Sequence, residues 1–365
     1  MAEKNVVAFG NFDLTGARSW VIRTGLQEAG YHVSFCRTEA AGLLGKYRDL
    51  QRKWKECRVG ADAIYVVFLG HYLMPLAWYV ARREKIPVIF DAFLSLYDTE
   101  VNDRARVSRL SPRAWILWMT DWFSCRLADV VLLDTEEHKQ YFVEHYGVDP
   151  QKILVLPVGC RSDLFKPDSL PAVQGPPKAF RVHFHGTYIP LQGVDVILGA
   201  ARELQERKED VSFALLGKGQ TFDAMRVLAE QWKLQNVEFF HSVPISQLPA
   251  FINQADVCLG IFGTTAKADR VIPNKAYEVI ACGKPLITGS TTASKRVFKD
   301  RDNVLLSPPG DAHALAESIL VLKNDAELRE RIAQGGLELS RTLCDPEVIV
   351  TPLREWLSAN LHNKH

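Results

Sequence analysis

The sequence predicts an α/β protein made of two doubly wound lobes that face each other across a cleft. Short runs of Val, Ile, Leu and Phe alternate along the chain with longer helical patterns, as is typical of parallel sheets covered on both faces. The chain has 365 residues, about twice the usual domain length. A stretch rich in Pro and Gly separates two sets of apolar runs.

Each set of apolar runs is expected to form one sheet. The first set is NVVAFG, HVSFC, AIYVVFL, VIFDAF and VVLLD, and the second is RVHFHG, SFALLG, VEFF, VCLGIF and PLITG. Between them, FKPDSLPAVQGPPKAF loses all periodicity and reads as a linker. We therefore expect a first lobe over residues 1–165, with 345–365 as a candidate addition to it, a linker over 166–179 and a second lobe over 180–344.

Composition limits the possible partners and compartments. With 44 Lys and Arg against 43 Asp and Glu, no broad nucleic-acid footprint is expected. Seven scattered cysteines without a C-x-x-C pair disfavour a disulfide framework and a zinc site. The start of the chain resembles a strand rather than a signal peptide. The most aromatic stretch is interrupted by Asp121, Arg126 and Asp129, so we expect a cytoplasmic protein, at most peripheral at a membrane.

In the second set, three strands run through a turn into a helix. Gly186 marks the first turn, and Gly217 and Gly219 mark the second. The third connection is the longer VCLGIFGTTAKADRVIPNKAYEVIACG. Ligands of open α/β sheets lie beyond the carboxyl ends of strands, where helix N-termini offer free N–H groups. These turns are therefore candidate sites, although each glycine also suits an ordinary tight turn.

The third connection contains a single carboxylate near a predicted helix start. Pro273 or Asn274 suits the start of a helix and Gly283 suits its end. Glu278 then lies near the first turn, where its carboxylate is able to accept two hydrogen bonds from the vicinal diol of a ribose. Lys275 and the nearby backbone amides are candidates for a diphosphate, and exposed helix residues are the alternative interpretation.

At this point the residues resemble a known family. LLGKGQTFDAMRVLAEQWKLQNVEFFHSVPISQLPAFINQADVCLGIF, followed by PNKAYEVIACGKPLITG, is similar to the nucleotide-sugar domain of the retaining GT-B glycosyltransferases of group 1, or family 4. The resemblance covers residues 180–340 well and the first lobe more thinly. It implies two Rossmann-like lobes, a nucleotide-sugar donor in the second, a saccharide or glycolipid acceptor in the first, and no metal or other cofactor.

The sequence departs from the family pattern in places. The family carries two glutamates eight positions apart; Glu278 matches the second, but Arg270 stands at the first. Thr187 and Gln192 occupy the positions of the usual Arg and Lys. Other cations are therefore candidates for the diphosphate. The residues expected to bind the donor are Glu278, Lys275, Asn274, Gly186, Thr187, Gly217, Gly219, Arg270, Lys267 and Gly10; for Lys267 and Arg270 a solvated mobile loop is the alternative.

The first lobe offers one candidate catalytic residue. Asp91 comes at the end of the strand VIFDAF, where it is a candidate base or positioning group for the acceptor hydroxyl. A helix cap is the alternative, because aspartate is a common N-cap. His183 and His185 share one face of a strand, but with no third ligand nearby we do not expect a metal site.

Two stretches combine basic and aromatic residues: GKYRDLQRKWKECR, and RARVSRLSPRAWILWMTDWF. A basic aromatic surface suits an anionic membrane and a lipid-linked acceptor. Half-buried helices are the alternative, and we favour it, because apolar residues are usually core.

Three functions follow as hypotheses. The first is a glycosyltransferase that moves a sugar from a nucleoside diphosphate to a hydroxyl of a saccharide or lipid-linked acceptor, with retention as the resemblance implies. The second, supported by the departures from the family pattern, is a catalytically silent relative that binds nucleotide or saccharide and supports a partner enzyme. The third is a nucleotide-sugar epimerase on the same architecture.

Overall fold

The computed structural model describes residues 4–167 and 179–361, and the chain divides into two compact units. Unit 1 comprises Met1–Gly159 with Asp345–His365, and unit 2 comprises Cys160–Cys344. The first boundary thus precedes the one expected at residue 165, and the final segment belongs to unit 1. Most of the expected linker, residues 168–178, lies outside the described residues.

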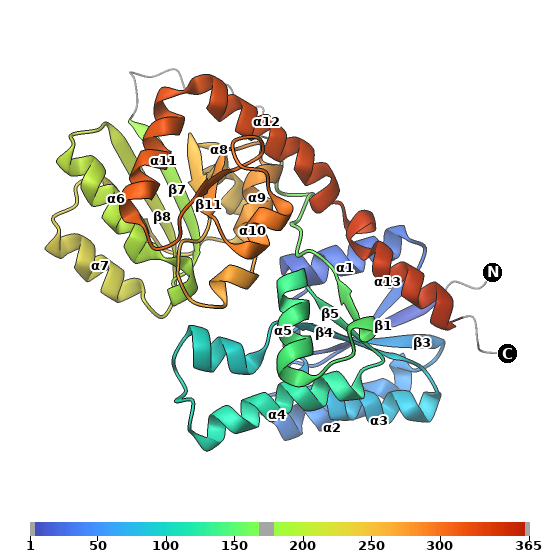
Figure 1. Ribbon diagram of the computed structural model, residues 1–365. Coiled ribbons are helices and arrows are strands. Elements are labelled where there is room, and N and C mark those ends of the chain that lie inside the picture. The colour runs from blue at the N-terminus through green and yellow to red at the C-terminus, as the bar shows by residue number, and fades with distance from the viewer. Residues whose placement is uncertain (1–3, 168–178, 362–365) are drawn as a thin grey trace. The chain divides into compact units, whose positions relative to one another are not determined.

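Unit 1 contains a parallel sheet of six strands in the order β2-β1-β3-β4-β5-β6 (Figure 1). The strands are β1 (Asn5–Gly10), β2 (His32–Arg37), β3 (Ala61–Val66), β4 (Val88–Phe93), β5 (Val130–Leu133) and β6 (Ile153–Val155). The helices are α1 (Ala17–Glu28), α2 (Leu43–Cys57), α3 (Met74–Glu84), α4 (Pro112–Leu127), α5 (Glu136–Tyr146) and α13 (Pro346–Leu361).

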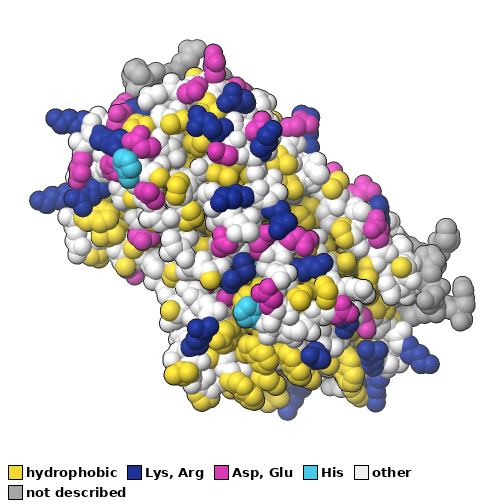
Figure 2. Space-filling model, viewed as in Figure 1, with side chains coloured by type: hydrophobic (Ala, Val, Ile, Leu, Met, Phe, Trp, Pro, Cys, Tyr) yellow, Lys and Arg dark blue, Asp and Glu magenta, His cyan; other side chains and the backbone are white. Residues whose placement is uncertain are grey.

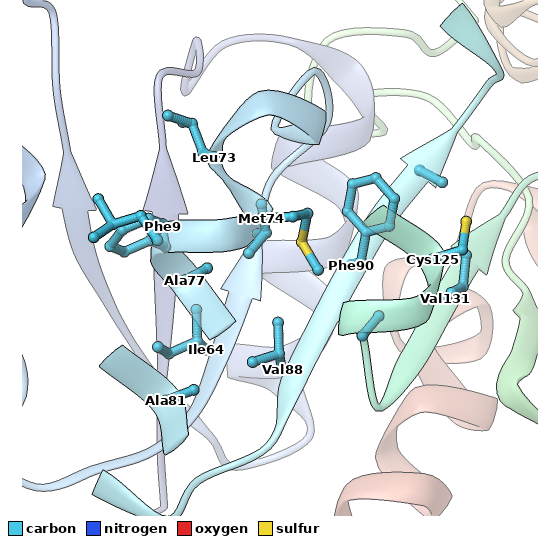
Figure 3. Packing of buried hydrophobic residues seen from close by; sticks show 14 of the residues in the cluster. Phe9, Ile64, Leu73, Met74, Ala77, Ala81, Val88, Phe90, Cys125 and Val131 are labelled. Atoms are coloured by element: carbon cyan, nitrogen blue, oxygen red, sulfur yellow. The ribbon is translucent and has the colours of Figure 1, made fainter. Parts of the chain in front are cut away.

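Alternating strand residues face two helical layers in unit 1. Phe9 and Phe90 pack with α2, α3, α4 and α5 on one face, as Figure 3 shows for part of this cluster. Ala8 and Ile89 pack with α1 and α13 on the other. Because neighbouring residues of a strand point to opposite faces, continuous apolar strands require both layers. The predicted doubly wound arrangement is confirmed.

The last helix completes the second layer although it comes from the far end of the chain. α13 packs along α1, and a Cβ at Gly25 would lie 2.2 Å from the carbonyl oxygen of Pro346. Glycine is therefore required where the two helices meet. The sequence leaves the docking of this segment open, because its partner lies more than 300 residues earlier.

Unit 2 contains a second parallel sheet, in the order β12-β11-β10-β7-β8-β9. Its strands are β7 (Phe180–Thr187), β8 (Val211–Lys218), β9 (Val237–Phe240), β10 (Val257–Leu259), β11 (Leu286–Gly289) and β12 (Leu305–Ser307). Its helices are α6 (Val194–Glu206), α7 (Phe222–Gln231), α8 (Leu248–Asn253), α9 (Asn274–Ala281), α10 (Thr292–Val297), α11 (Ala312–Asn324) and α12 (Ala326–Leu343).

The strand order of unit 2 reverses between β7 and β10. Chain connections leave this point in opposite directions, so the loops at the carboxyl ends of the two strands separate and open a crevice. This topological switch point is the position at which doubly wound sheets bind ligands. Among the described helices of both units, none is both long and apolar enough to cross a bilayer.

Candidate active site

The helix that contains the single carboxylate begins at the switch point of unit 2. α9 begins at Asn274, after Pro273 in an extended conformation, and Gly283 follows its end with φ of +64°. The predicted start and stop signals are confirmed. Asn274 is exposed, whereas Lys275 and Glu278 point inward and are buried. Glu278 lies in the second turn of the helix rather than the first.

Lys275 directs its ammonium group at the end of β7. The side chain is 4% exposed. Its Nζ donates to Gln192 Oε1 and, at 3.4 Å, to the carbonyl oxygen of Gly260, and it lies 3.6 Å from the ring centroid of Phe184. A Cβ at Gly186 would lie 2.8 Å from this nitrogen, so the glycine admits the ammonium.

The positive charge of the Lys275 ammonium is only weakly balanced by its surroundings. Burial lowers its pKa well below the usual 10.5, and the charge of Glu278 counteracts that shift only in part. Its close partners are an amide oxygen, a carbonyl oxygen and an aromatic face, all of them neutral. A buried cation in such surroundings favours an anionic ligand, because the ligand would supply the missing charge.

Glu278 belongs to a second buried group of side chains. Its Oε2 lies 2.9 Å from Nε2 of His185, and Nδ1 of His185 lies 3.1 Å from Nε2 of His183. Burial, and secondarily the charge of Lys275, lowers the pKa of His185 to about 3, so this imidazole is neutral and carries one N–H. Donation of that N–H to an ionised Glu278 leaves Nδ1 to accept from His183.

The pKa of the Glu278 carboxyl group is also shifted. Burial raises the pKa of Glu278 to about 7, although Lys275 acts in the opposite direction. A carboxylate poised near neutral pH, with its orientation fixed by a histidine, is suited to accept hydrogen bonds from ligand hydroxyls.

A pocket of about 470 Å³ opens beside this cluster at the carboxyl ends of β7 and β8. It is lined by His185, Gly186, Thr187, Leu216, Gly217, Lys218, Gly219, Ser242, Val243 and Leu248. Its volume suits a small-molecule ligand. A larger hollow of about 660 Å³ beside α7 and β9 is lined by residues such as Arg226, Glu230 and Phe239. It lies away from the switch point, so we assign the ligand to the smaller pocket.

The predicted glycines shape this pocket. Gly217 has φ of +149°, and a Cβ there would lie 2.0 Å from the carbonyl oxygen of Gly186. Gly219 has φ of +152°, and its Cβ would lie 2.5 Å from the carbonyl oxygen of Tyr188. Both positions require glycine, because other residues strain the backbone and collide with the neighbouring turn.

The two remaining cations of the loop have a different environment from the one expected. Lys267 is buried rather than solvated, and Arg270 is half-buried at the end of a short 3-10 helix, Ala268–Arg270. Both side chains engage other groups of the protein. Their interpretation as residues of a solvated mobile loop is therefore wrong, while their contact with a diphosphate stays a prediction.

In unit 1, Gly10 ends β1, where it is buried, and Asp91 lies within β4 with 0% exposure. Asp91 Oδ1 lies 2.8 Å from Nε of Arg18, and Oδ2 accepts a 2.9 Å hydrogen bond from Tyr65. The predicted cap is wrong, because Asp91 precedes no helix. As a base, Asp91 would become accessible to an acceptor hydroxyl only if Arg18 moved, so the structure favours a structural ion pair over the predicted catalytic role.

Sequence reasoning missed two partners. His185 is separated from Glu278 by 93 positions and Gln192 from Lys275 by 83, so no local spacing links them. The available signal for His185 was the period of two in β7, which places it and His183 opposite the core residues Val182 and Phe184.

Comparison with known proteins identifies the family. The model of "Glycosyl transferases group 1" matches residues 168–338, and that of the "Glycosyl transferase 4-like domain" matches residues 10–159. The chain belongs to the group 1 glycosyltransferases. The boundary between the two matches falls close to the division between units 1 and 2.

Named relatives of this group 1 glycosyltransferase are distant. A D-inositol 3-phosphate glycosyltransferase of Corynebacterium glutamicum is 25% identical over 59% of this chain and 54% of its own length. The chain thus spans about half the length of the curated relatives that it matches first.

Solved structures share the fold. Sucrose-phosphate synthase from Thermosynechococcus elongatus superposes with a TM-score of 0.74 at 16% identity, covering 98% of this chain and 99% of that one. Anabaena HepE in complex with UDP gives a TM-score of 0.69 at 16% identity, covering 97% and 100%. The two-lobed α/β architecture of the glycosyltransferase is therefore the GT-B fold.

Proposed function

We propose that this protein transfers a sugar from a nucleoside diphosphate donor to a hydroxyl of a saccharide or lipid-linked acceptor, with retention of anomeric configuration. The observation that carries the proposal is the buried Lys275 and Glu278 at the switch point of unit 2, beside a pocket of about 470 Å³. Family membership supports the reaction class, and the chemistry of these two groups supports the donor class.

In this proposal Glu278 binds the ribose. Its carboxylate accepts hydrogen bonds from the two vicinal hydroxyls, and the hydrogen bond from His185 fixes the orientation of that carboxylate. Hydrogen bonds to a charged acceptor in a buried site contribute about 1.5–3 kcal/mol. His185 therefore acts as a positioning residue for Glu278 rather than as a metal ligand.

Lys275 neutralises the diphosphate. Negative charge grows on the leaving diphosphate as the bond to the sugar breaks, and a cation placed beforehand in a poorly hydrated site stabilises it. The ammonium from α9 takes the role of the Arg and Lys that Thr187 and Gln192 replace. It also supplies the charge that a divalent metal would otherwise provide, so we propose transfer without a metal.

Two further assignments belong to the same proposal. Unit 1 would bind the acceptor. The protein would work in the cytoplasm, since all seven cysteines are free thiols, which suits a reducing compartment.

A silent binding protein is the second candidate, and Arg270 favours it. The family places a glutamate at this position, and the half-buried Arg270 is unable to accept hydrogen bonds from a donor sugar. Such a protein would bind nucleotide or saccharide without turnover, in support of a partner enzyme.

The first test is calorimetric titration with UDP, GDP and ADP, with magnesium and with a chelator. We expect one nucleotide to bind equally in both conditions. Affinity should fall at least about tenfold in Glu278→Ala, which corresponds to about 1.4 kcal/mol. Glu330→Ala, an exposed glutamate on α12, is the matched control. Equal affinity of Glu278→Ala and wild type would contradict the assignment of the ribose site.

Turnover then separates the candidate functions. Incubation of the matching nucleotide sugar with candidate acceptors should release nucleoside diphosphate and form a glycoside, whose anomeric configuration nuclear magnetic resonance reports. Saturable binding without turnover would identify the silent relative. Conversion of the donor sugar in the absence of any acceptor would identify an epimerase.

A further inference from the structure

Large apolar side chains are exposed on α3, on α4 and in the turn that precedes α4 in unit 1. Leu110, Trp115 and Ile116 are 96%, 66% and 54% exposed, and Phe123 is 46% exposed. Trp78 and Tyr79 of the adjacent α3 are also exposed. We call these six residues the docking face. Figure 2 shows hydrophobic side chains with Lys and Arg along the edge of unit 1 where Figure 1 places α3 and α4.

The preferred interpretation as half-buried helices is confirmed for three of the four tryptophans in the two basic aromatic stretches. Trp54 of α2 is buried, and Trp118 and Trp122 of α4 pack against the core of unit 1, as that preference predicts. Trp115 and Ile116 instead point outward on the same helix. A helix that already has a core-facing side does not need these residues for folding, so they are available for an external partner.

The exposed charge beside the docking face is mostly positive. Arg82, Arg83, Arg109, Arg113 and Arg126 are exposed beside it. Arg82 lies 5.9 Å from the ring of Trp78, and Arg83 lies 4.8 Å from that of Tyr79. The only acidic residue of α4, Asp121, is 0% exposed and accepts hydrogen bonds from Ser95 and Tyr146.

This arrangement is unusual for a chain whose Lys and Arg nearly equal its Asp and Glu. Of the arginines next to the apolar side chains, Arg82 pairs with the partly exposed Asp129 at 3.5 Å. α4 itself offers no exposed carboxylate to the others. Local positive charge around tryptophan and aliphatic residues is complementary to an anionic lipid surface, where aromatic rings lie at the headgroup level. Each basic residue near such a surface strengthens binding by electrostatic attraction.

A second copy of the chain is a poorer occupant. In a symmetric dimer through this face, the arginines of one copy would approach those of the other, and like charges across an interface oppose association. We therefore propose that the docking face binds the surface of an anionic membrane, with Trp115, Ile116 and Leu110 at the headgroup boundary and the arginines on lipid phosphates. The inference does not depend on sugar transfer.

Cosedimentation with vesicles tests the proposal on the full chain. We expect binding to vesicles of phosphatidylcholine with phosphatidylglycerol, and much weaker binding to phosphatidylcholine alone. The Arg109→Gln/Arg113→Gln variant should bind at least about tenfold more weakly. The affinity of the Trp115→Ser/Ile116→Ser variant for these vesicles should also fall at least about tenfold, because the variant lacks the apolar contact.

Matched controls keep the test specific. Val348→Ser on α13 and Val227→Ser on α7 remove exposed apolar side chains elsewhere, and both should bind like wild type. All replaced side chains are exposed, so thermal midpoints should be unchanged, which shows that the variants fold. Equal binding to both kinds of vesicle, wild-type binding by the variants, or no binding would overturn the proposal. A concentration-dependent dimer that Trp115→Ser/Ile116→Ser abolishes would assign the face to a second copy instead.

Discussion

Each unit contains a buried cation and a buried anion, but the two units differ in whether these charges contact each other. In unit 1, Arg18 and Asp91 contact each other directly at 2.8 Å. In unit 2, Lys275 donates to Gln192 and Glu278 accepts from His185, so each charge has a neutral primary partner. The same ingredients therefore form an ion pair in one unit and two separately buried charges in the other.

The pKa shifts follow this difference. Burial by itself lowers the pKa of Arg18, but Asp91, together with Tyr65 and Asp134, outweighs burial and the pKa is raised. For Lys275 and Glu278 burial dominates, so the pKa of the lysine is lowered and that of the glutamate is raised to about 7. A buried charge paired by direct contact contributes to the structure, whereas a buried charge beside a pocket that touches no counter-ion indicates a binding site.

The largest expected effect tests the structural pair. Asp91→Ala leaves the guanidinium of Arg18 buried without its counter-ion, and should lower the free energy of unfolding by about 3–5 kcal/mol. Urea unfolding followed by tryptophan fluorescence measures this. The double variant Arg18→Met/Asp91→Leu removes both charges, so its free energy of unfolding should fall by less than that of Asp91→Ala. Normal stability of Asp91→Ala together with lost activity would instead restore Asp91 as a catalytic residue.

Lys275→Met should show the opposite pattern. The free energy of unfolding should not fall, because the variant removes a buried ammonium whose close partners are neutral. Affinity for the nucleoside diphosphate should fall at least about tenfold, since charge-assisted hydrogen bonds contribute about 1.5–3 kcal/mol. Lys299→Met, at an exposed lysine, is the control. A strongly destabilised Lys275→Met would show that both units use their buried cation structurally.

Proton uptake sharpens the contrast further. A diphosphate next to Lys275 raises the pKa of the ammonium back toward its usual range, so binding should be accompanied by proton uptake wherever Lys275 of the free protein is partly deprotonated. Calorimetry in two buffers of different ionisation enthalpy measures the number of protons taken up. The uptake should be absent in Lys275→Met, and its persistence there would show that another group takes up the proton.

The smallest effect concerns pH and Glu278. Nucleotide affinity should rise as pH increases through about 7, where the carboxylate ionises, and this step should be absent in Glu278→Gln. Because the folded pKa is raised above 4.5, this group's contribution to the free energy of unfolding declines between pH 4.5 and about 7. Denaturation across that range should show a smaller decline in Glu278→Gln. Identical pH profiles for the two proteins would contradict the assignment.

Local signals determined much of the architecture from the sequence. Continuous apolar runs predict buried parallel strands, because both faces of such strands are covered. Pro273 and Gly283 predict the limits of α9, because the conformations of one or two residues decide where a helix starts and stops. The place of Glu278 near a helix start suggested a ribose contact, and the resemblance to a family supported it. The matches to both units confirm the family, while the role of Glu278 stays a prediction.

Tertiary structure alone decided which side chains meet and which charges are buried. His185 reaches Glu278, Gln192 reaches Lys275, and Arg18 reaches Asp91 only because parallel strands bring distant segments to one edge of a sheet. The exposure of Trp115 likewise depends on how α4 lies against its core. Strand and helix periods are local properties of the chain, whereas desolvation and pairing of charges are properties of the packed unit. The sequence therefore identified the candidate residues, and the fold decided what each one contacts.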